Sequence, residues 1–133
     1  MSLLKSALID YAGAAVGAAN NTDANTSILD MSGWDGVVFL TTITDCVSGG
    51  VATLKVEASD TNADGGMSAV TGATAAATSG ANDDLNGQLL IVDVFRPQKR
   101  YVQGVRTSAT QNIAFGDTIA ILKPRRVPAS GSR

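Results

Sequence analysis

The chain has 133 residues, enough for one domain, and 44% of them are hydrophobic, although many of these are alanine and only six residues are aromatic. It contains no histidine and a single cysteine, Cys46, which excludes histidine-based acid–base catalysis, histidine metal sites and an internal disulfide. Residues 1–95 carry two basic and eleven acidic residues, a balance of −9, whereas residues 96–133 carry eight basic residues and one acid, a balance of +7. Such a split indicates a partner, because surfaces of unlike charge favour docking in one orientation.

The first 24 residues show no clear periodic pattern, and we interpret them as an extended N-terminal arm. Residues 3–9 fit either a first strand or a short arm, and residues 12–19 are rich in alanine and glycine. Gly13 and Gly17 argue against a stable helix there. The stretch resembles a signal peptide only superficially, and no segment is long enough to span a bilayer. We therefore expect a soluble protein made in the cytoplasm, with no membrane partner.

From residue 25 onward the pattern is typical of β-strands. It predicts a short strand at Ser27–Met31, a tight turn at residues 32–36 and a β-branched strand at Val37–Thr44. Val51–Ser59 alternates between apolar and polar residues, which predicts a half-buried antiparallel strand. The residues expected to face the core are Ala52, Leu54, Val56 and Ala58.

Two polar loops and the strongest strands occupy the second half. Residues 60–66 predict a loop, Met67–Val70 a single helical turn and Ala73–Ala77 a weak strand. Residues 79–87 predict another loop. The strongest predicted strands are Gln88–Phe95, Arg100–Thr107 and Asp117–Leu122.

Seven or eight short strands separated by Gly, Asn and Asp turns predict an all-β fold: an antiparallel β-sandwich, jelly roll or small barrel. We expect a single jelly-roll-like β-sandwich domain over residues 25–123. The arm (residues 1–24) precedes it, and a basic, partly disordered tail (residues 124–133) follows it. Because alanine buries little area, the core is thin for the chain's length, and we expect contacts with other copies to supplement it.

No residue pattern points to catalysis. Residues 60–65 loosely resemble a calcium loop, but Thr71 stands where the closing glutamate would be, so a solvated loop is the simpler interpretation. The serines have no histidine partner, and no glycine-rich phosphate loop precedes a lysine and a helix. We therefore expect no enzyme activity, no metal site and no cofactor.

Basic residues beside aromatic ones mark a candidate interaction surface. A face for single-stranded nucleic acid is one interpretation, which would also use Phe95 and Arg106. The acidic remainder and an isoelectric point near 4.8 argue against it, so we expect no nucleic-acid partner and favour protein docking. The candidate residues here are Arg96, Lys99, Arg100 and Tyr101. Trp34, the only tryptophan, fits either a core residue under a turn or an exposed binding anchor.

Three segments, residues 25–40, 51–60 and 89–102, resemble small structural proteins of tailed phages that are encoded beside the major capsid protein. The resemblance runs over residues 25–127, and its most specific part is residues 93–102, DVFRPQKRYV. Proteins of this group are assigned as head decoration proteins, also called capsid cement proteins.

The resemblance implies a jelly-roll cement protein that binds the outside of the capsid shell as a dimer or trimer and has no enzyme activity or cofactor. Its partners would be the major capsid protein and itself, and its place would be the outer surface of the virion. The chain ends become candidate contacts, and an arm that orders on the capsid would fold on binding. The terminal candidates are Leu3, Leu4, Lys5, Arg125 and Arg126.

Two alternatives remain open. One is a tail-tube or head–tail connector subunit. The other is a β-sandwich that binds a ligand such as a carbohydrate, although the chain has few aromatic residues for stacking on sugar rings.

Overall fold

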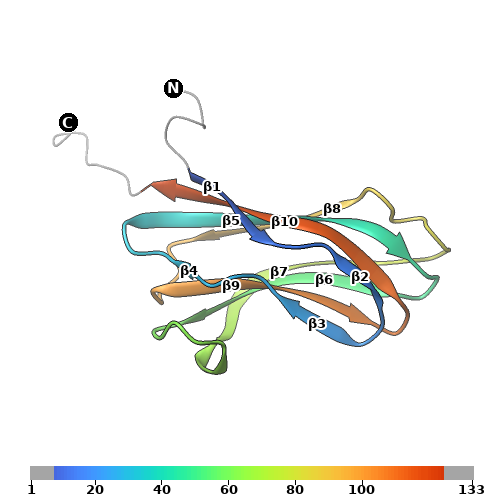
Figure 1. Cartoon of the computed structure of the whole chain (residues 1–133), viewed down its shortest axis with the longest axis horizontal. Helices are drawn as coiled ribbons and strands as arrows, with labels where there is room; N and C mark the ends of the chain where they lie inside the picture. The colour runs from blue at the N-terminus through green and yellow to red at the C-terminus, as the bar shows by residue number, and fades with distance from the viewer. Residues whose placement is uncertain (1–7, 125–133) are drawn as a thin grey trace.

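Two antiparallel β-sheets lie face to face in the computed structural model, which describes residues 8–124 (Figure 1). Sheet A contains β1 (Leu8–Gly13), β2 (Val16–Ala19), β5 (Trp34–Cys46), β8 (Leu89–Phe95) and β10 (Ile113–Pro124). Sheet B contains β3 (Thr22–Asn25), β4 (Leu29–Asp30), β6 (Val51–Ser59), β7 (Ser68–Thr78) and β9 (Tyr101–Ala109). The predicted all-β antiparallel sandwich is confirmed.

The order of the strands is that of a jelly roll. Sheet A runs β1-β10-β5-β8 with β2 also on β10, and sheet B runs β3-β9-β6-β7 with β4 also on β9. Strands from the beginning of the chain therefore pair with strands from its end in both sheets. This arrangement of two interleaved Greek keys defines the jelly roll.

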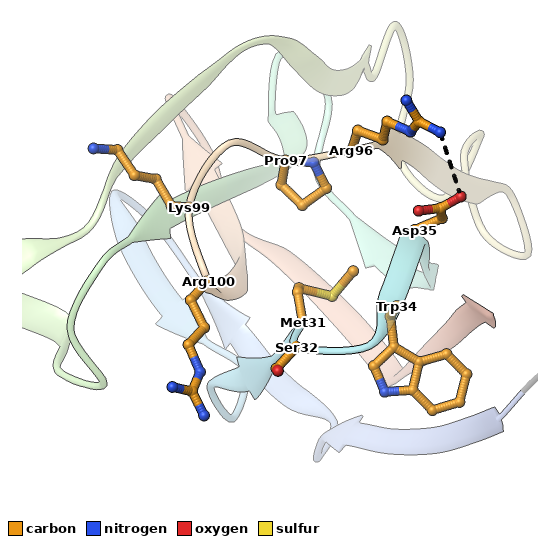
Figure 2. Close-up of a pocket in the computed structure, with 8 residues that line it drawn as sticks. All are labelled: Met31, Ser32, Trp34, Asp35, Arg96, Pro97, Lys99 and Arg100. Carbon is orange, nitrogen blue, oxygen red and sulfur yellow. Dashed lines mark ion pairs between the residues drawn. The ribbon is translucent and has the colours of Figure 1, made fainter. Parts of the chain in front are cut away.

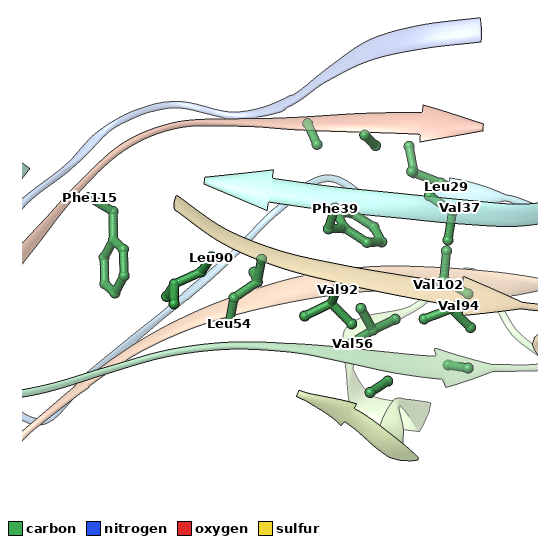
Figure 3. Close-up of a cluster of buried hydrophobic side chains, with 14 of the residues drawn as sticks. Leu29, Val37, Phe39, Leu54, Val56, Leu90, Val92, Val94, Val102 and Phe115 are labelled. Atoms are coloured by element: carbon green, nitrogen blue, oxygen red, sulfur yellow. The ribbon is translucent and has the colours of Figure 1, made fainter. Parts of the chain in front are cut away.

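Alternation along the strands places the core between the sheets. β6 has the bounds predicted for it, and its apolar residues Ala52, Leu54, Val56 and Ala58 are all buried. Figure 3 shows larger side chains from both sheets meeting them, among them Phe39 of β5. The core combines these large residues with several alanines.

The expectation of an extended arm is wrong for residues 8–24. β1 pairs with β10, with Leu8 opposite Leu122, and β3 pairs with β9. Ala12 is buried in the core. Small side chains give these strands little local pattern, and their partners lie far along the chain, so the sequence alone did not reveal them. Residues 1–7 of the expected arm lie outside the described residues.

Three smaller expectations also differ from the structure. Met67–Val70 is not a helical turn, because a 3-10 turn forms earlier, at Asp64–Gly66, and β7 already begins at Ser68. The tight turn expected at residues 32–36 is shorter, since β5 begins at Trp34. Pro124, assigned to the tail, still belongs to β10 and pairs with Trp34.

A buried arginine links the two sheets near the start of the chain. The guanidinium of Arg106, on β9, donates hydrogen bonds to the carbonyl oxygens of Ala14 at 2.6 Å, Ala24 at 3.3 Å and Asn25 at 3.3 Å. Its side chain is buried, and this burial lowers the pKa of the guanidinium. Arg106 therefore holds the strands β1–β3 in place and is not part of a cationic surface.

The described residues contain no helix of the length and hydrophobicity needed to cross a membrane.

Candidate functional site

A hollow of about 540 Å³ opens at the end of the sandwich where β5 begins and where β8 leads into β9 (Figure 2). Two segments form its walls: residues 31–35, at the start of β5, and residues 96–100, between β8 and β9. The lining residues are Met31, Ser32, Trp34, Asp35, Arg96, Pro97, Lys99 and Arg100. The structure thus brings together four of the residues predicted from sequence: Trp34, Arg96, Lys99 and Arg100.

Backbone hydrogen bonds hold the two walls against each other. The amide of Arg96 donates to the carbonyl oxygen of Asp35 at 2.6 Å, and the amide of Met31 donates to that of Arg100 at 2.7 Å. Arg96 has a φ of 52°, a left-handed backbone conformation that is rare for residues other than Gly, Asn and Asp. This conformation turns the chain sharply before Pro97, and the side chain of Met31 extends from the opposite wall toward Pro97 (Figure 2).

Arg100 and Asp30 form a two-pronged ion pair beside the hollow. Nε of Arg100 donates to Oδ1 of Asp30 at 2.9 Å, and Nη2 donates to Oδ2 at 2.8 Å. These hydrogen bonds, together with one from the amide of Ser32, lower the pKa of Asp30 to about 2. The same contact raises the pKa of Arg100, so this pair stays ionised across the physiological range.

The other two cations of the hollow also have acidic partners. Nζ of Lys99 lies 3.0 Å from Oδ2 of Asp60, and Nη2 of Arg96 lies 3.9 Å from Oδ2 of Asp35 (Figure 2). Arg96 also covers the ring of Phe95, with its guanidinium carbon 5.1 Å from the ring centre. Each cation is therefore held in place by a local partner but keeps an exposed side from which it can contact a protein.

The charge split along the sequence does not become two faces of opposite charge. Among residues 8–124, Lys55 and Lys123 pair with Glu57 and Asp93, and the three cations of the hollow pair with acids from the first part of the chain. The sixth basic residue of this range, Arg106, is buried. Antiparallel pairing of early and late strands thus converts the asymmetry into ion pairs, and this range carries twelve acids against six basic residues.

The remaining predicted residues occupy positions around the same end. Trp34 is half-buried and packs against the core, and it also lines the hollow, so both of its expected roles are compatible with its place. Tyr101 lies next to the hollow without lining it, and the guanidinium carbon of Arg100 lies 5.2 Å from its ring centre. Leu3, Leu4, Lys5, Arg125 and Arg126 lie outside the described residues.

Both described ends of the chain meet at this end of the sandwich. Leu8, the first described residue, pairs with Leu122. Pro124, the last one, pairs with Trp34 of the hollow. The segments that carry the terminal candidates therefore begin beside the hollow.

Sequence reasoning missed the acidic half of the site. Asp30, Asp35 and Asp60 pair with the cations of the hollow, but Asp30 and Asp35 were not singled out, and Asp60 was considered only as part of a calcium-like loop. A signal was present, since Asp30 and Asp35 flank Trp34 within the segment that resembles phage proteins. Their pairing depends on which strands lie side by side within each sheet, which that signal does not specify.

The described residues show no cluster of three or more His, Cys, Asp or Glu side chains that could hold a metal ion. The acids of the loop that resembled a calcium site have other contacts. Asp60 pairs with Lys99, and Oδ1 of Asp64 accepts hydrogen bonds from Asn25 and Gln103. The residues that line the hollow supply three cationic side chains, an indole ring and a thioether, which are groups that can contact a partner.

The sequence matches no known protein family and no curated protein. Among solved structures, the PBSX exported protein XepA has a TM-score of 0.63 and 17% identity, over 97% of this chain and 40% of that one. The chain therefore spans less than half the length of XepA.

A second similar structure is a Clostridium thermocellum xylanase 10B fragment with CBM22-1 and GH10 modules, complexed with xylohexaose. Its TM-score is 0.52 at 14% identity, over 92% of this chain and 26% of that one. The SPBc2 prophage-derived protein YomS has a TM-score of 0.47 at 11% identity, over 86% of this chain and 94% of that one, which is too low to carry an argument. Phage-derived proteins are thus among the structural neighbours, and at these identities the likeness shows the fold alone.

Proposed function

We propose that this chain is a structural protein of a phage virion that decorates the head. In this role it binds the outside of the major capsid protein shell and stabilises the shell against the pressure of packaged DNA. It is made in the host cytoplasm and acts on the outer capsid surface, without enzyme activity or a cofactor.

The clustering of candidate contacts at one end of the sandwich carries this proposal. Residues 93–102, the most specific part of the resemblance to phage decoration proteins, form the end of β8, a wall of the hollow and the start of β9. Trp34 and the origins of both terminal segments lie at the same end. A domain whose candidate contacts all lie at one end can bind through that end to a larger surface such as the capsid shell.

The ion pairs of the hollow suit contact with a charged protein surface. Arg96, Lys99 and Arg100 are each at least about half exposed at the side chain, so each can exchange its internal acid for one on the capsid. Exposed pairs of this kind contribute little individually, and exchanging them costs little. Many copies on one particle sum modest contacts into a stable layer.

Purified particles provide the test. We expect a copy number close to that of the major capsid protein, and loss of the chain under mild denaturation that leaves the shell intact. The variant R96E/R100E should reduce occupancy at least tenfold, because it reverses two charges at the docking end. The matched control K55E reverses an ion-paired cation on sheet B and should leave occupancy unchanged. Normal occupancy of the double variant would contradict docking through this end.

The same measurement addresses the main alternative. A handful of copies per particle, located at the tail by imaging, would favour a tail-tube or head–tail connector subunit over head decoration.

Carbohydrate binding is a second candidate, favoured by the half-buried Trp34 in a polar hollow and by the fold it shares with the xylanase fragment. Titration calorimetry with xylohexaose tests it directly. Heat of binding in the unaltered chain that W34A abolishes would support it, and absence of heat at millimolar sugar would dismiss it for this ligand.

A further inference from the structure

The outer face of sheet A, the side turned away from the core, is apolar across all four of its main strands. Cross-strand pairing places Ile9, Ile121 and Val38 in one row over β1, β10 and β5. A second row contains Tyr11, Ile119, Leu40 and Ile91 and reaches β8. Side chains of such a row lie on the same face of the sheet, so the two rows form one continuous patch.

The edge strands show how little covers this patch. Tyr11 is 59% exposed on β1, and Ile91 is 53% exposed on β8. Leu89 and Phe95, at the two ends of β8, extend the patch and are also more than half exposed. Monomeric proteins seldom leave so many large apolar side chains together in water.

The outer face of sheet B provides the contrast within the same molecule. There β6 presents Thr53, Lys55 and Glu57, and β7 presents Thr74 opposite Lys55. This is the pattern of a sheet with one face in water. β8 reads LLIVDVF, with apolar residues on both faces, which is the pattern of a strand covered on both sides. Within residues 8–124, the chain covers only one of these two faces.

We propose that a second copy of this chain covers the outer face of sheet A, by face-to-face packing of the two sheets. The inference concerns self-association and does not depend on the virion role proposed above. Like sheets share the same twist, so two copies can stack with aligned strands at about 10 Å separation.

Charge favours another copy as the occupant. The described residues have an acidic surplus, but the patch contains only one ion pair, Lys123 with Asp93 at 3.1 Å, and is neutral there. At its rim, Asp117 accepts a hydrogen bond from the Tyr11 hydroxyl. Two copies that meet through this face therefore do not bring like charges together. A basic partner would instead be attracted to the acidic loops. The ion pair of Lys123 and Asp93 can also fix the register of the two sheets.

Size also favours another copy. Four strands at a spacing of about 4.8 Å and a length of about 20 Å give a flat area of about 400 Å². Protruding side chains raise the accessible area toward the roughly 800 Å² that each partner buries in a specific interface.

The mass of the full chain in solution tests the proposal, measured by light scattering coupled to size exclusion. We expect at least twice the 13.5 kDa of one chain at about 100 µM, where a specific interface of standard size is formed. I91E should weaken association at least tenfold, and I91T should weaken it less. The matched control T74E places the same charge on β7, the edge strand of sheet B, and should keep the mass of the unaltered chain. Circular dichroism verifies that each variant is folded.

Three results would overturn the inference. The first is a mass of 13.5 kDa for the unaltered chain. The second is a folded I91E variant that associates as strongly as T74E. The third is a monomer that begins to associate only after residues 1–7 are deleted, which would make that segment the occupant of the face.

Discussion

Replacing Arg106 by methionine tests whether a buried guanidinium holds the first three strands in place. The substitution keeps an unbranched side chain but removes all three hydrogen bonds to the carbonyl oxygens of Ala14, Ala24 and Asn25. A buried acceptor that loses its donor costs about 1–3 kcal/mol of stability. We place R106M in that range, because the bonds to Ala24 and Asn25 are long and that to Ala14 is short. The stability of such a domain is about 5–15 kcal/mol, so the loss is easily measured.

Urea unfolding, followed by the fluorescence of the single tryptophan, measures the effect. R100M is the matched control: it makes the same chemical change at an exposed arginine and should shift the unfolding midpoint far less. Hydrogen exchange should also become faster at the amide of Ser27, which donates to Ala12, because β1 and β3 lose their common anchor. A loss below about 1 kcal/mol for R106M, or equal midpoint shifts for both variants, would refute the reasoning.

Three further predictions concern a close contact, an ion pair and a strained turn. G104A places a Cβ 3.1 Å from the ring of Phe39, so overpacking should lower the free energy of unfolding by about 1–3 kcal/mol, as measured in urea. An unchanged urea midpoint would show that the ring moves aside freely. The carboxyl of Asp30 should titrate by NMR at about 2, so its contribution to stability is present above about pH 4 and is lost as the pH falls toward 2. R100M removes the largest cause of the shift and should raise the pKa of Asp30 toward its ordinary value near 3.9, while the amide of Ser32 still lowers it; no change on substitution would assign the shift to another cause. Thr110 has a φ of 73°, which a β-branched residue adopts only under strain. T110N should therefore raise the free energy of unfolding by about 1 kcal/mol and the melting temperature by a few degrees, and an equal or lower melting temperature would contradict this.

The sequence predicted the elements whose pattern is local. β6 was found with its bounds because four apolar and four polar residues alternate without interruption. β8 and β9 were found because turn-forming residues separate long apolar runs. β1 and β2 were not, since alanine and glycine give no alternation and these strands are defined by their pairing with β10.

The candidate site was also predictable only where its residues are close together in the sequence. The basic residues Arg96, Lys99 and Arg100 are neighbours in sequence, so their cluster was visible, and the turn between β8 and β9 brings them to one hollow. Their partners Asp30 and Asp60 come from elsewhere in the chain, and only the strand register brings them near. The exposed outer face of sheet A could not be predicted for a related reason. A run of apolar residues such as that of β8 predicts a strand, but it does not show whether the chain covers one face of that strand or both.

The pairing of early and late strands determines how the chain acquires its structure during synthesis. Tyr11 of β1 and Asp117 of β10 are 106 residues apart, so β1 has no partner until nearly all of the described chain has left the ribosome. Contacts this distant in sequence close slowly, because the entropy of forming the loop is lost before the contact forms. We expect folding in one late step, on a timescale of milliseconds to seconds, with no stable half-sandwich on the way. Until that step, the apolar strands of sheet A remain exposed to chaperones and to other nascent chains.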